Sequence, residues 1–164
     1  MNVCKQLAVF AKAPVAGEVK TRLVPSISSV QACQLHKKLV VHTLQTGTSL
    51  AYCQAILFAS KADKWWDELL REYPLELHYQ QGKDLGERMH SAIHVLWSAL
   101  EETEMESQIL LVGTDCPFIT DEYIEQAYSE LNDSDLVIGP AEDGGYVLIG
   151  MKVPHRELFE GVDW

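Results

Sequence analysis

The sequence predicts an α/β protein of three layers, in which helices cover both faces of a mostly parallel sheet that includes one late antiparallel strand. Short apolar runs at residues 6–10, 54–59 and 109–112 are typical of strands buried on both faces, as strands are in parallel sheets. Segments with helical patterns separate these runs along the chain. The repeated order of strand, loop and helix therefore favours the α/β class.

The first helix is expected to begin at Ser28 or Ser29, after the first strand and a long loop. Gln31 stands three residues after Ser28, which is the spacing of a capping box. Apolar residues then recur along the segment until Gly47, and glycine is a common residue just after a helix. We therefore expect Gly47 to end this helix.

The second strand, at residues 54–59, is followed by a helix expected over residues 61–73. Two adjacent tryptophans on a helix cannot both face the sheet, because neighbouring side chains point in different directions. The pattern favours Trp65, Leu69 and Leu70 on the buried face and leaves Trp66 partly exposed, with core packing favoured over a stacking role for its indole.

A third strand at residues 75–79 leads into a glycine-containing turn and another helix. Asp84 and Glu87 have capping-box spacing, so this helix is expected to begin at Asp84 and to run to about residue 100. These elements continue the alternation of strand and helix.

The last third of the chain is expected to hold one helix and a hairpin. Thr120 is a suitable cap for a helix that runs to about residue 131, and a buried strand follows at residues 135–139. The pair Gly144-Gly145 then allows a tight turn before a returning strand at residues 146–149. This returning strand is the antiparallel member of the predicted sheet.

Size and charge restrict the class of protein. The 164 residues suit a single domain over residues 1–164, and 47% hydrophobic residues are ordinary for a globular protein. A net charge of −11 argues against a general binder of nucleic acid or anionic membranes. No apolar run approaches the ~20 residues that span a membrane, and no leader is evident, so we expect no membrane insertion and a cytoplasmic location.

Asp115 stands where the buried strand at residues 109–112 stops. Carboxyl ends of strands are where open α/β sheets bind ligands, and Cys116-Pro117 turns the chain at once, so the carboxylate would be held on a short corner. Asp115 is thus a candidate ligand for a metal or for the phosphate side of a nucleotide. A turn or helix-capping aspartate is the alternative.

The loop over residues 11–25 is the candidate phosphate site. Small residues, among them Gly17, let backbone amides approach a ligand, and Lys12, Lys20 and Arg22 supply positive charge. The Walker spacing of glycine and lysine is absent. A solvated basic loop with no ligand is the alternative reading of the same residues.

Two further turns are expected at the same edge of the sheet. In residues 80–89, Gly82 allows close backbone approach, and Leu85 and Arg88 lie at the start of the next helix, where they would border a nucleotide base. The hairpin turn presents carboxylates, and Asp143 would share a divalent cation, Mg²⁺ or Mn²⁺, with Asp115. An ordinary hairpin turn is the alternative. The candidate acceptor site comprises Glu142, Asp143, Gly144, Gly145 and Tyr146.

Four stretches together resemble one bacterial family, at residues 9–23, 82–89, 110–120 and 139–150. The family is the domain of unknown function 2064, also called radical-SAM/selenodomain-associated transferases, within the nucleotide-diphospho-sugar transferase superfamily. The resemblance implies a GT-A, Rossmann-like fold, a nucleotide donor in the first half and a divalent metal at Asp115. It also implies an incomplete C-terminal part, because similar proteins continue past Trp164.

The function implied is that of a metal-dependent transferase. It would take a nucleoside triphosphate or a nucleotide sugar as donor and a small molecule as acceptor, and would act as a nucleotidyltransferase or a glycosyltransferase. The residues expected to carry the chemistry are Lys20, Arg22, Asp115 and Asp143. The alternative is a nucleotide-binding partner or sensor module without catalysis. The oligomeric state is not indicated by the sequence.

Overall fold

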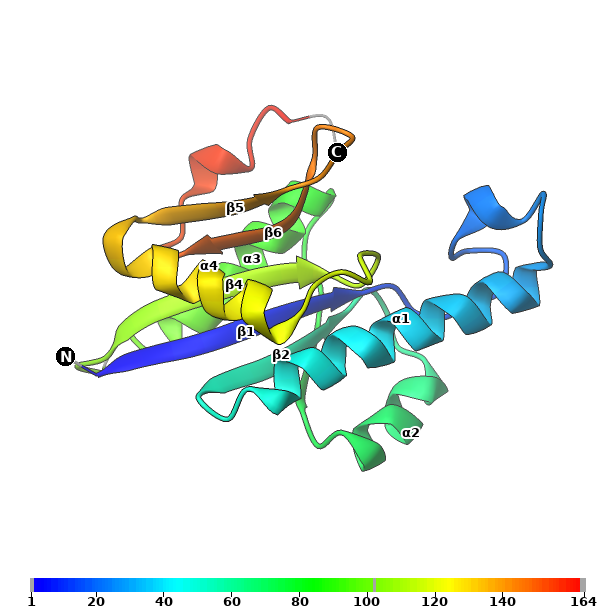
Figure 1. Ribbon diagram of the computed structural model, residues 1–164, viewed down its shortest axis with the longest axis horizontal. Helices are drawn as coiled ribbons and strands as arrows, with labels where there is room; N and C mark the ends of the chain where they lie inside the picture. The colour runs from blue at the N-terminus through cyan, green and yellow to red at the C-terminus, as the bar shows by residue number, and fades with distance from the viewer. Residues whose placement is uncertain (1, 102, 163–164) are drawn as a thin grey trace.

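A computed structural model describes residues 2–101 and 103–162, and the described chain forms a six-stranded sheet in the order β3-β2-β1-β4-β6-β5 (Figure 1). The pairs β1 with β2, β2 with β3 and β1 with β4 are parallel, whereas β6 is antiparallel to both of its neighbours. The strands are β1 (Val3–Ala11), β2 (Cys53–Ala59), β3 (Glu76–Tyr79), β4 (Glu106–Gly113), β5 (Leu136–Pro140) and β6 (Tyr146–Met151). The predicted mostly parallel sheet with a late antiparallel strand is confirmed.

Helices cover both faces of this sheet. The first core cluster joins one face to α1 (Ser29–Ser49), α2 (Lys64–Glu72) and α4 (Asp121–Asp133). The second cluster joins the other face to α3 (Leu85–Ser98) and to Phe159, which follows the short helix η2 (Arg156–Leu158). Figure 1 shows α1 and α4 in front of the sheet and α3 behind it. The three-layer α/β/α fold class is therefore confirmed.

The apolar runs in the sequence correspond to strands whose two faces are both buried. In β1, Leu7 and Val9 belong to the first core cluster, and Ala8 and Phe10 belong to the second. Successive side chains of a strand point to opposite faces, so a strand between two helical layers needs apolar residues at every position. The burial of both faces explains why these strands show no alternation of polar and apolar residues.

The predicted helix starts agree with the observed caps. Ser28 Oγ accepts a hydrogen bond from the Gln31 amide, and the Gln31 side chain accepts one from the Ser28 amide, which completes the capping box. Thr120 caps α4, and Asp84 caps α3. The Glu87 carboxylate accepts a hydrogen bond from the Lys83 amide at 2.8 Å. In a capping box, it would accept from the amide of the cap residue, Asp84.

The prediction that Gly47 ends the first helix is wrong, because α1 continues to Ser49. Gly47 is buried, and a Cβ atom there would lie 2.9 Å from Leu7 Cδ2 and 3.3 Å from Ala55 Cβ. The glycine is therefore a packing residue that brings α1 close to the sheet, and packing outweighs its low helix propensity.

The expected orientation of the tryptophan pair is also wrong. Trp66 is buried, with 1% of its surface exposed, whereas Trp65 is only partly buried. The helix begins at Lys64 instead of residue 61, and the Trp66 indole N–H donates to the Lys61 carbonyl at 3.0 Å. Because that bond satisfies the buried N–H, the full indole can pack against the sheet. Trp65 instead lies under the Lys37 ammonium group.

The parallel strands bring several loops to one edge of the sheet. The loops after β1, β2, β3 and β4 leave from this edge, and the turn between β5 and β6 lies on the same side (Figure 1). Across the described residues, no helix combines the length and hydropathy required to traverse a bilayer. The expectation about continuation past Trp164 concerns a position outside the described residues.

Candidate functional site

A cavity of about 690 Å³ lies at the carboxyl edge of the sheet. Open α/β sheets bind ligands at this edge, because the loops that leave successive parallel strands converge there. The wall includes residues from the ends of β1 and β4, from the loops after β2 and β3, and from the start of α3 and the middle of α1. Predicted site residues that line it are Lys12, Leu85, Arg88 and Asp115.

Lys20 and Asp115 form an ion pair at the cavity. Lys20 Nζ lies 2.9 Å from Asp115 Oδ1, and the lysine side chain is 17% exposed while the aspartate side chain is 76% exposed. The pair joins the loop after β1 to the corner after β4. His42 Nε2 donates to the Pro117 carbonyl at 3.0 Å and fixes that corner against α1. The structure therefore brings the predicted phosphate-binding lysine and the predicted metal ligand into direct contact.

The backbone at Lys20 is unusual. Its φ of 51° and ψ of 36° are left-handed, and within residues 2–101 and 103–162 it is the only residue other than glycine with a positive φ. A side chain in this conformation costs on the order of 1–2 kcal/mol. Lys20 is the residue that precedes the short helix η1 (Thr21–Leu23). The loop therefore holds Lys20 in a strained conformation that directs its side chain to Asp115.

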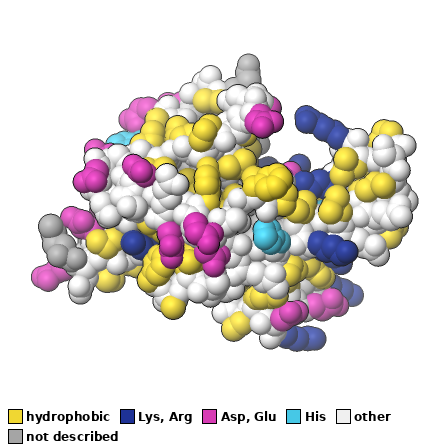
Figure 2. All heavy atoms as spheres, viewed as in Figure 1, with side chains coloured by type: hydrophobic (Ala, Val, Ile, Leu, Met, Phe, Trp, Pro, Cys, Tyr) yellow, Lys and Arg dark blue, Asp and Glu magenta, His cyan; other side chains and the backbone are white. Residues whose placement is uncertain are grey.

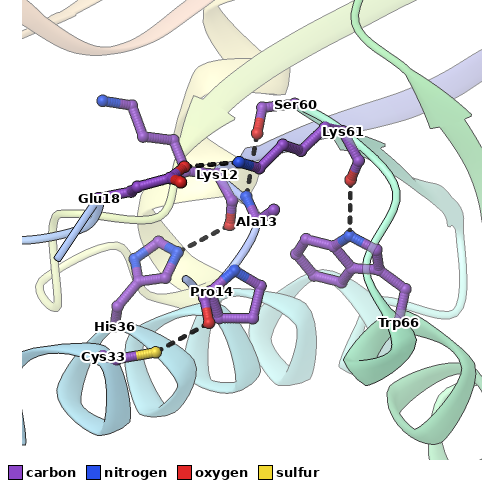
Figure 3. Close-up of polar contacts among 9 residues, drawn as sticks. All are labelled: Lys12, Ala13, Pro14, Glu18, Cys33, His36, Ser60, Lys61 and Trp66. Carbon is purple, nitrogen blue, oxygen red and sulfur yellow. Dashed lines mark hydrogen bonds and ion pairs between the residues drawn. The ribbon is translucent and has the colours of Figure 1, made fainter. Parts of the chain in front are cut away.

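A second ion pair connects the same loop to the end of β2. Lys61 Nζ lies 2.5 Å from Glu18 Oε2, and both residues line the cavity. Figure 3 shows the Lys61 side chain extended toward Glu18 above Ala13. The sequence offered no sign of this pair, because its two residues belong to separate loops and match no motif.

His36 belongs to the buried part of the cavity wall and is 2% exposed. Its Nε2 lies 2.9 Å from the Lys12 carbonyl oxygen, and because a carbonyl only accepts, this nitrogen carries the proton (Figure 3). Burial lowers the pKa of His36, against the Lys12 hydrogen bond and the charge of Asp115, which raise it. The histidine thus supports the loop after β1 from the side of α1.

Several polar bonds hold the strand ends in place. The Ala13 amide donates to Ser60 Oγ at 3.0 Å, so the loops after β1 and β2 are joined (Figure 3). Gln80 Nε2 donates to the Phe58 carbonyl at 2.9 Å. Arg88 Nε donates to the Gly82 carbonyl at 3.1 Å. These bonds give the cavity a fixed wall before any ligand binds.

The turn that contains Gly82 requires a glycine at this position. Its φ is +145°, and a Cβ atom there would lie 2.7 Å from the Arg88 amide nitrogen. No other residue type fits that approach without a shift of the backbone. Gly82 itself lines a separate cavity of about 540 Å³ beside η2 and shapes the main cavity through Arg88.

The cavity is locally basic within an acidic chain. Lys12, Lys61 and Arg88 line it, whereas its lining carboxylates are Glu18 and Asp115. Within the described chain, the Lys12 ammonium group has no ion-pair partner. On the face of the molecule drawn in Figure 2, most of the visible Lys and Arg side chains lie in the right half. A net charge of −11 therefore coexists with a local site suited to anions.

Other predicted residues lie outside the lining of this cavity. Gly17 is exposed, with a φ of +88°, in the turn that precedes Lys20. Arg22 is exposed on η1. The structure thus places Lys12 and Lys20 at the cavity, whereas Arg22 lies on η1, outside the cavity lining.

The hairpin turn between β5 and β6 is closed by its own bonds. Asp143 Oδ1 accepts from the Gly145 amide at 3.1 Å, and the Ala141 amide donates to the Gly145 carbonyl at 2.9 Å. Gly144 has a φ of +89°, which suits glycine. Glu142 and Asp143 are exposed at this turn and do not line the main cavity.

Tyr146 follows the turn and packs toward α3. Its hydroxyl donates to Met89 Sδ at 3.9 Å, and its side chain contacts the core cluster on the α3 face. Burial raises the pKa of Tyr146 to about 12. The phenol therefore stays protonated and neutral over the physiological range of pH.

The donor set at Asp115 fits a magnesium or manganese ion. These ions bind one or two carboxylates together with water and substrate phosphates, and Asp115 offers an exposed carboxylate at the mouth of a basic cavity. Within the part of the chain that the structure describes, no three His, Cys, Asp or Glu side chains form a ready metal site. A metal held by Asp115 would complete its coordination with water and with oxygens of a substrate.

Residues that the sequence left out of the site include Glu18, His36, Ser60, Lys61 and Gln80. Ser60, Lys61 and Gln80 directly follow strands, His36 lies inside α1, and Glu18 lies in the turn before Lys20; none has a motif of its own. The only usable signal was position, since Ser60 and Lys61 follow β2 as Lys12 follows β1. Residues that follow parallel strands meet at one edge, so that rule would have found three of the five, Ser60, Lys61 and Gln80.

Similar solved structures define the class of this fold. A proposed nucleotide-diphospho-sugar transferase from Desulfovibrio desulfuricans G20 is 30% identical with a TM-score of 0.84, over 98% of this chain and 69% of that chain. A 4-diphosphocytidyl-2C-methyl-D-erythritol synthase from Anaerococcus prevotii DSM 20548 is 14% identical, with a TM-score of 0.60, over 95% of this chain and 73% of that one. Another synthase of that name is 10% identical, with a TM-score of 0.65, over 99% and 82%.

The fold is thus that of nucleotide-diphospho-sugar transferases, and the site lies at the edge where such sheets bind ligands. The chain belongs to DUF2064, a family described as an uncharacterized protein conserved in bacteria, whose profile matches residues 43–164. The family resemblance seen in the sequence is therefore confirmed. No curated protein shows significant similarity to the chain.

Proposed function

We propose that the protein is a metal-dependent transferase that takes its donor, a nucleoside triphosphate or a nucleotide sugar, into the cavity at the carboxyl edge of the sheet. One observation carries the proposal: Lys12, Arg88 and Asp115 share this cavity, and Lys20 is bonded to Asp115. Cations and one exposed carboxylate in a confined space suit a polyphosphate with its counterion. The transferase fold of the relatives supports the same class of reaction.

The donor phosphates would bind beside the loop after β1. Lys12 and Lys20 would hold phosphate oxygens, and Arg22 could reach them only if η1 moved toward the cavity. Arg88 and the adjacent Leu85 would border the base on the opposite wall. Such contacts position the reacting group and neutralise its charge, which are the main protein contributions to phosphoryl and glycosyl transfer.

Asp115 would hold the metal, Mg²⁺ or Mn²⁺, with Asp143 as the second carboxylate if the hairpin turn approaches. When bound, the metal supplies positive charge next to the leaving diphosphate. Lys20 engages Asp115 Oδ1 in the free protein, so a metal would bind through Oδ2 or would replace the ammonium group, which would then be available to a phosphate oxygen. The ion pair thus couples the two halves of the proposed site.

Two reactions are compatible with these residues. In nucleotidyl transfer, an acceptor oxygen attacks the α-phosphorus, the bond from that phosphorus to the bridging oxygen breaks, and pyrophosphate leaves. In glycosyl transfer, an acceptor hydroxyl oxygen attacks the anomeric carbon, the bond from that carbon to the diphosphate oxygen breaks, the nucleoside diphosphate leaves, and the hydroxyl proton is released to water. Glu142 or Asp143 would orient the acceptor in both cases, with Gly144, Gly145 and Tyr146 forming the rest of the acceptor side.

Calorimetry with a panel of nucleotides and nucleotide sugars, with and without Mg²⁺ or Mn²⁺, tests the proposal. We expect metal-dependent binding of at least one donor. A subsequent assay for pyrophosphate release separates the two reactions, because only nucleotidyl transfer produces pyrophosphate. Binding without turnover on a panel of acceptors would favour a sensor module, and absence of any binding would overturn the proposed function.

A further inference from the structure

We propose that Lys61 is a phosphate-binding residue of this cavity and that Glu18 holds its ammonium group until the donor phosphates displace the carboxylate. The inference deepens the proposed function and rests on it. Lys61 Nζ lies 2.5 Å from Glu18 Oε2, and both residues belong to the cavity wall. The pair is the second ion pair, after Lys20 and Asp115, between the loop that follows β1 and the rest of the site.

The backbone of Lys61 is fixed by a buried side chain. Trp66 is 1% exposed, and its indole N–H donates to the Lys61 carbonyl at 3.0 Å. The preceding residue, Ser60, accepts the Ala13 amide at 3.0 Å. Figure 3 shows that the Lys61 side chain leaves this anchored point and runs toward Glu18. A flexible surface lysine would lack both anchors.

The partner of Lys61 can be exchanged at low cost. The side chains of Lys61 and Glu18 are 51% and 55% exposed, and an ion pair this accessible to water contributes little to stability. Glu18 brings one negative charge, whereas the phosphates of a nucleoside triphosphate or nucleotide sugar bring at least about two. A polyphosphate in the cavity therefore competes effectively with Glu18 for the ammonium group.

The location of the pair explains why a carboxylate would stand beside a phosphate-binding lysine. Lys12, Lys61 and Arg88 share one cavity, and cations kept close together repel one another when no anion is present. Glu18 offsets that repulsion in the free protein, as Asp115 does for Lys20. The arrangement favours ligands with several negative charges, because a singly charged anion gains little by replacing a carboxylate.

Titration of the full chain with inorganic pyrophosphate, without divalent cations, tests the inference. Lys61→Met should weaken pyrophosphate binding by at least about fivefold, and Glu18→Gln should strengthen it by about threefold or more. The double variant should bind as weakly as Lys61→Met alone, because Glu18 acts only through Lys61. Lys64→Met is the matched control, since Lys64 is exposed at the start of α2 and does not line the cavity.

The outcomes separate the two proposals. Equal pyrophosphate binding by the wild-type protein and Lys61→Met overturns the role of Lys61 alone, as does a gain from Glu18→Gln that persists in the double variant. A wild-type protein that binds neither pyrophosphate nor any nucleotide overturns the proposed function as well. Unfolding curves of each variant should match the wild type, because both side chains are half exposed.

Discussion

Lys20 Nζ and Asp115 Oδ1 lie 2.9 Å apart, although their residues come from loops at the ends of two different strands. The sequence indicated both residues separately, one as a phosphate ligand and one as a metal ligand. Their contact means that the positive and negative halves of the proposed site neutralise each other in the free protein. A ligand that uses Lys20 as a phosphate ligand would take it from Asp115, and binding measurements on variants of either residue can detect this exchange.

Replacement of Asp115 by alanine should abolish the gain in nucleotide affinity that a divalent cation provides. The side chain is 76% exposed at a strand end, so the free energy of unfolding should change by less than about 1 kcal/mol. Calorimetry with and without Mg²⁺ measures the first effect, and thermal unfolding measures the second.

Asp135→Ala is the matched control for that variant. Asp135 is also an exposed aspartate beside a lysine, at 3.9 Å from Lys152, but it lies at the opposite edge of the sheet, just before β5 begins. The control should keep the metal-dependent gain. Survival of that gain in Asp115→Ala would show that another group binds the metal.

Lys20→Gly should be more stable than Lys20→Ala by about 1 kcal/mol. Both variants lose the ion pair with Asp115, but only glycine adopts a φ of 51° without strain. At most positions an alanine variant is more stable than a glycine variant, because glycine loses more backbone entropy on folding. Chemical denaturation measures the difference, and both variants should bind polyphosphate more weakly than the wild type. Equal stability would mean that the left-handed backbone costs nothing here.

The free energy of unfolding should fall as the pH is lowered through 6.5, in part because of His36. Burial lowers the pKa of His36 below its ordinary value of 6.5, so the unfolded chain takes up a proton that the folded chain refuses. Stability therefore rises with pH in this window, by at most about 1.4 kcal/mol per pH unit for one group. Below the folded pKa the contribution becomes constant.

Denaturation of the variant His36→Gln at pH 7.5 and pH 5.0 tests this origin, because glutamine can still donate to the Lys12 carbonyl but does not titrate. The variant should show a smaller loss of stability on acidification than the wild type. His90, whose pKa burial also lowers, should account for part of the remainder. If His36→Gln loses as much stability between pH 7.5 and pH 5.0 as the wild type does, His36 is not a source of the pH dependence.

Gly47→Val should lower the free energy of unfolding by about 1–3 kcal/mol. A Cβ atom at Gly47 already meets Leu7 and Ala55 in the core, and valine adds two methyl groups to that contact. Thr48→Val, on an exposed position of the same helix, introduces a side chain of equal shape and should change stability by less than about 0.5 kcal/mol. Similar results for the two variants would rule out close packing as the reason for the glycine.

The sheet and its order of elements could be predicted from the sequence, because strands buried on both faces leave unbroken apolar runs. The capping box of α1 was equally visible, since Ser28 and Gln31 are close in sequence. The roles of Gly47 and Trp66 were not, because both depend on atoms from distant segments, Leu7 for the glycine and the Lys61 carbonyl for the indole. Rules that use only neighbouring residues predict the usual role of glycine at a helix end and cannot detect contacts with distant segments.

The same division holds for the candidate site. Lys12 and Asp115 were predicted because each follows a recognisable strand, and both line the cavity. Lys61 follows β2 closely enough for the same rule, but its pairing with Glu18 could not be predicted, because an ion pair across two loops leaves no pattern in either loop. The metal role of Asp143 stays a prediction. Its observed bond, to the Gly145 amide, is one that an ordinary turn also makes.

The position of β6 between β4 and β5 has a consequence for the order of folding. At the edge of the sheet, β5 has β6 as its one neighbouring strand, and β6 follows it in the chain. During synthesis β5 therefore emerges before the strand that connects it to the others. Because β6 lies between β5 and β4, β5 can join the sheet only once residues 146–151 are available, so closure of this side follows the rest of the sheet.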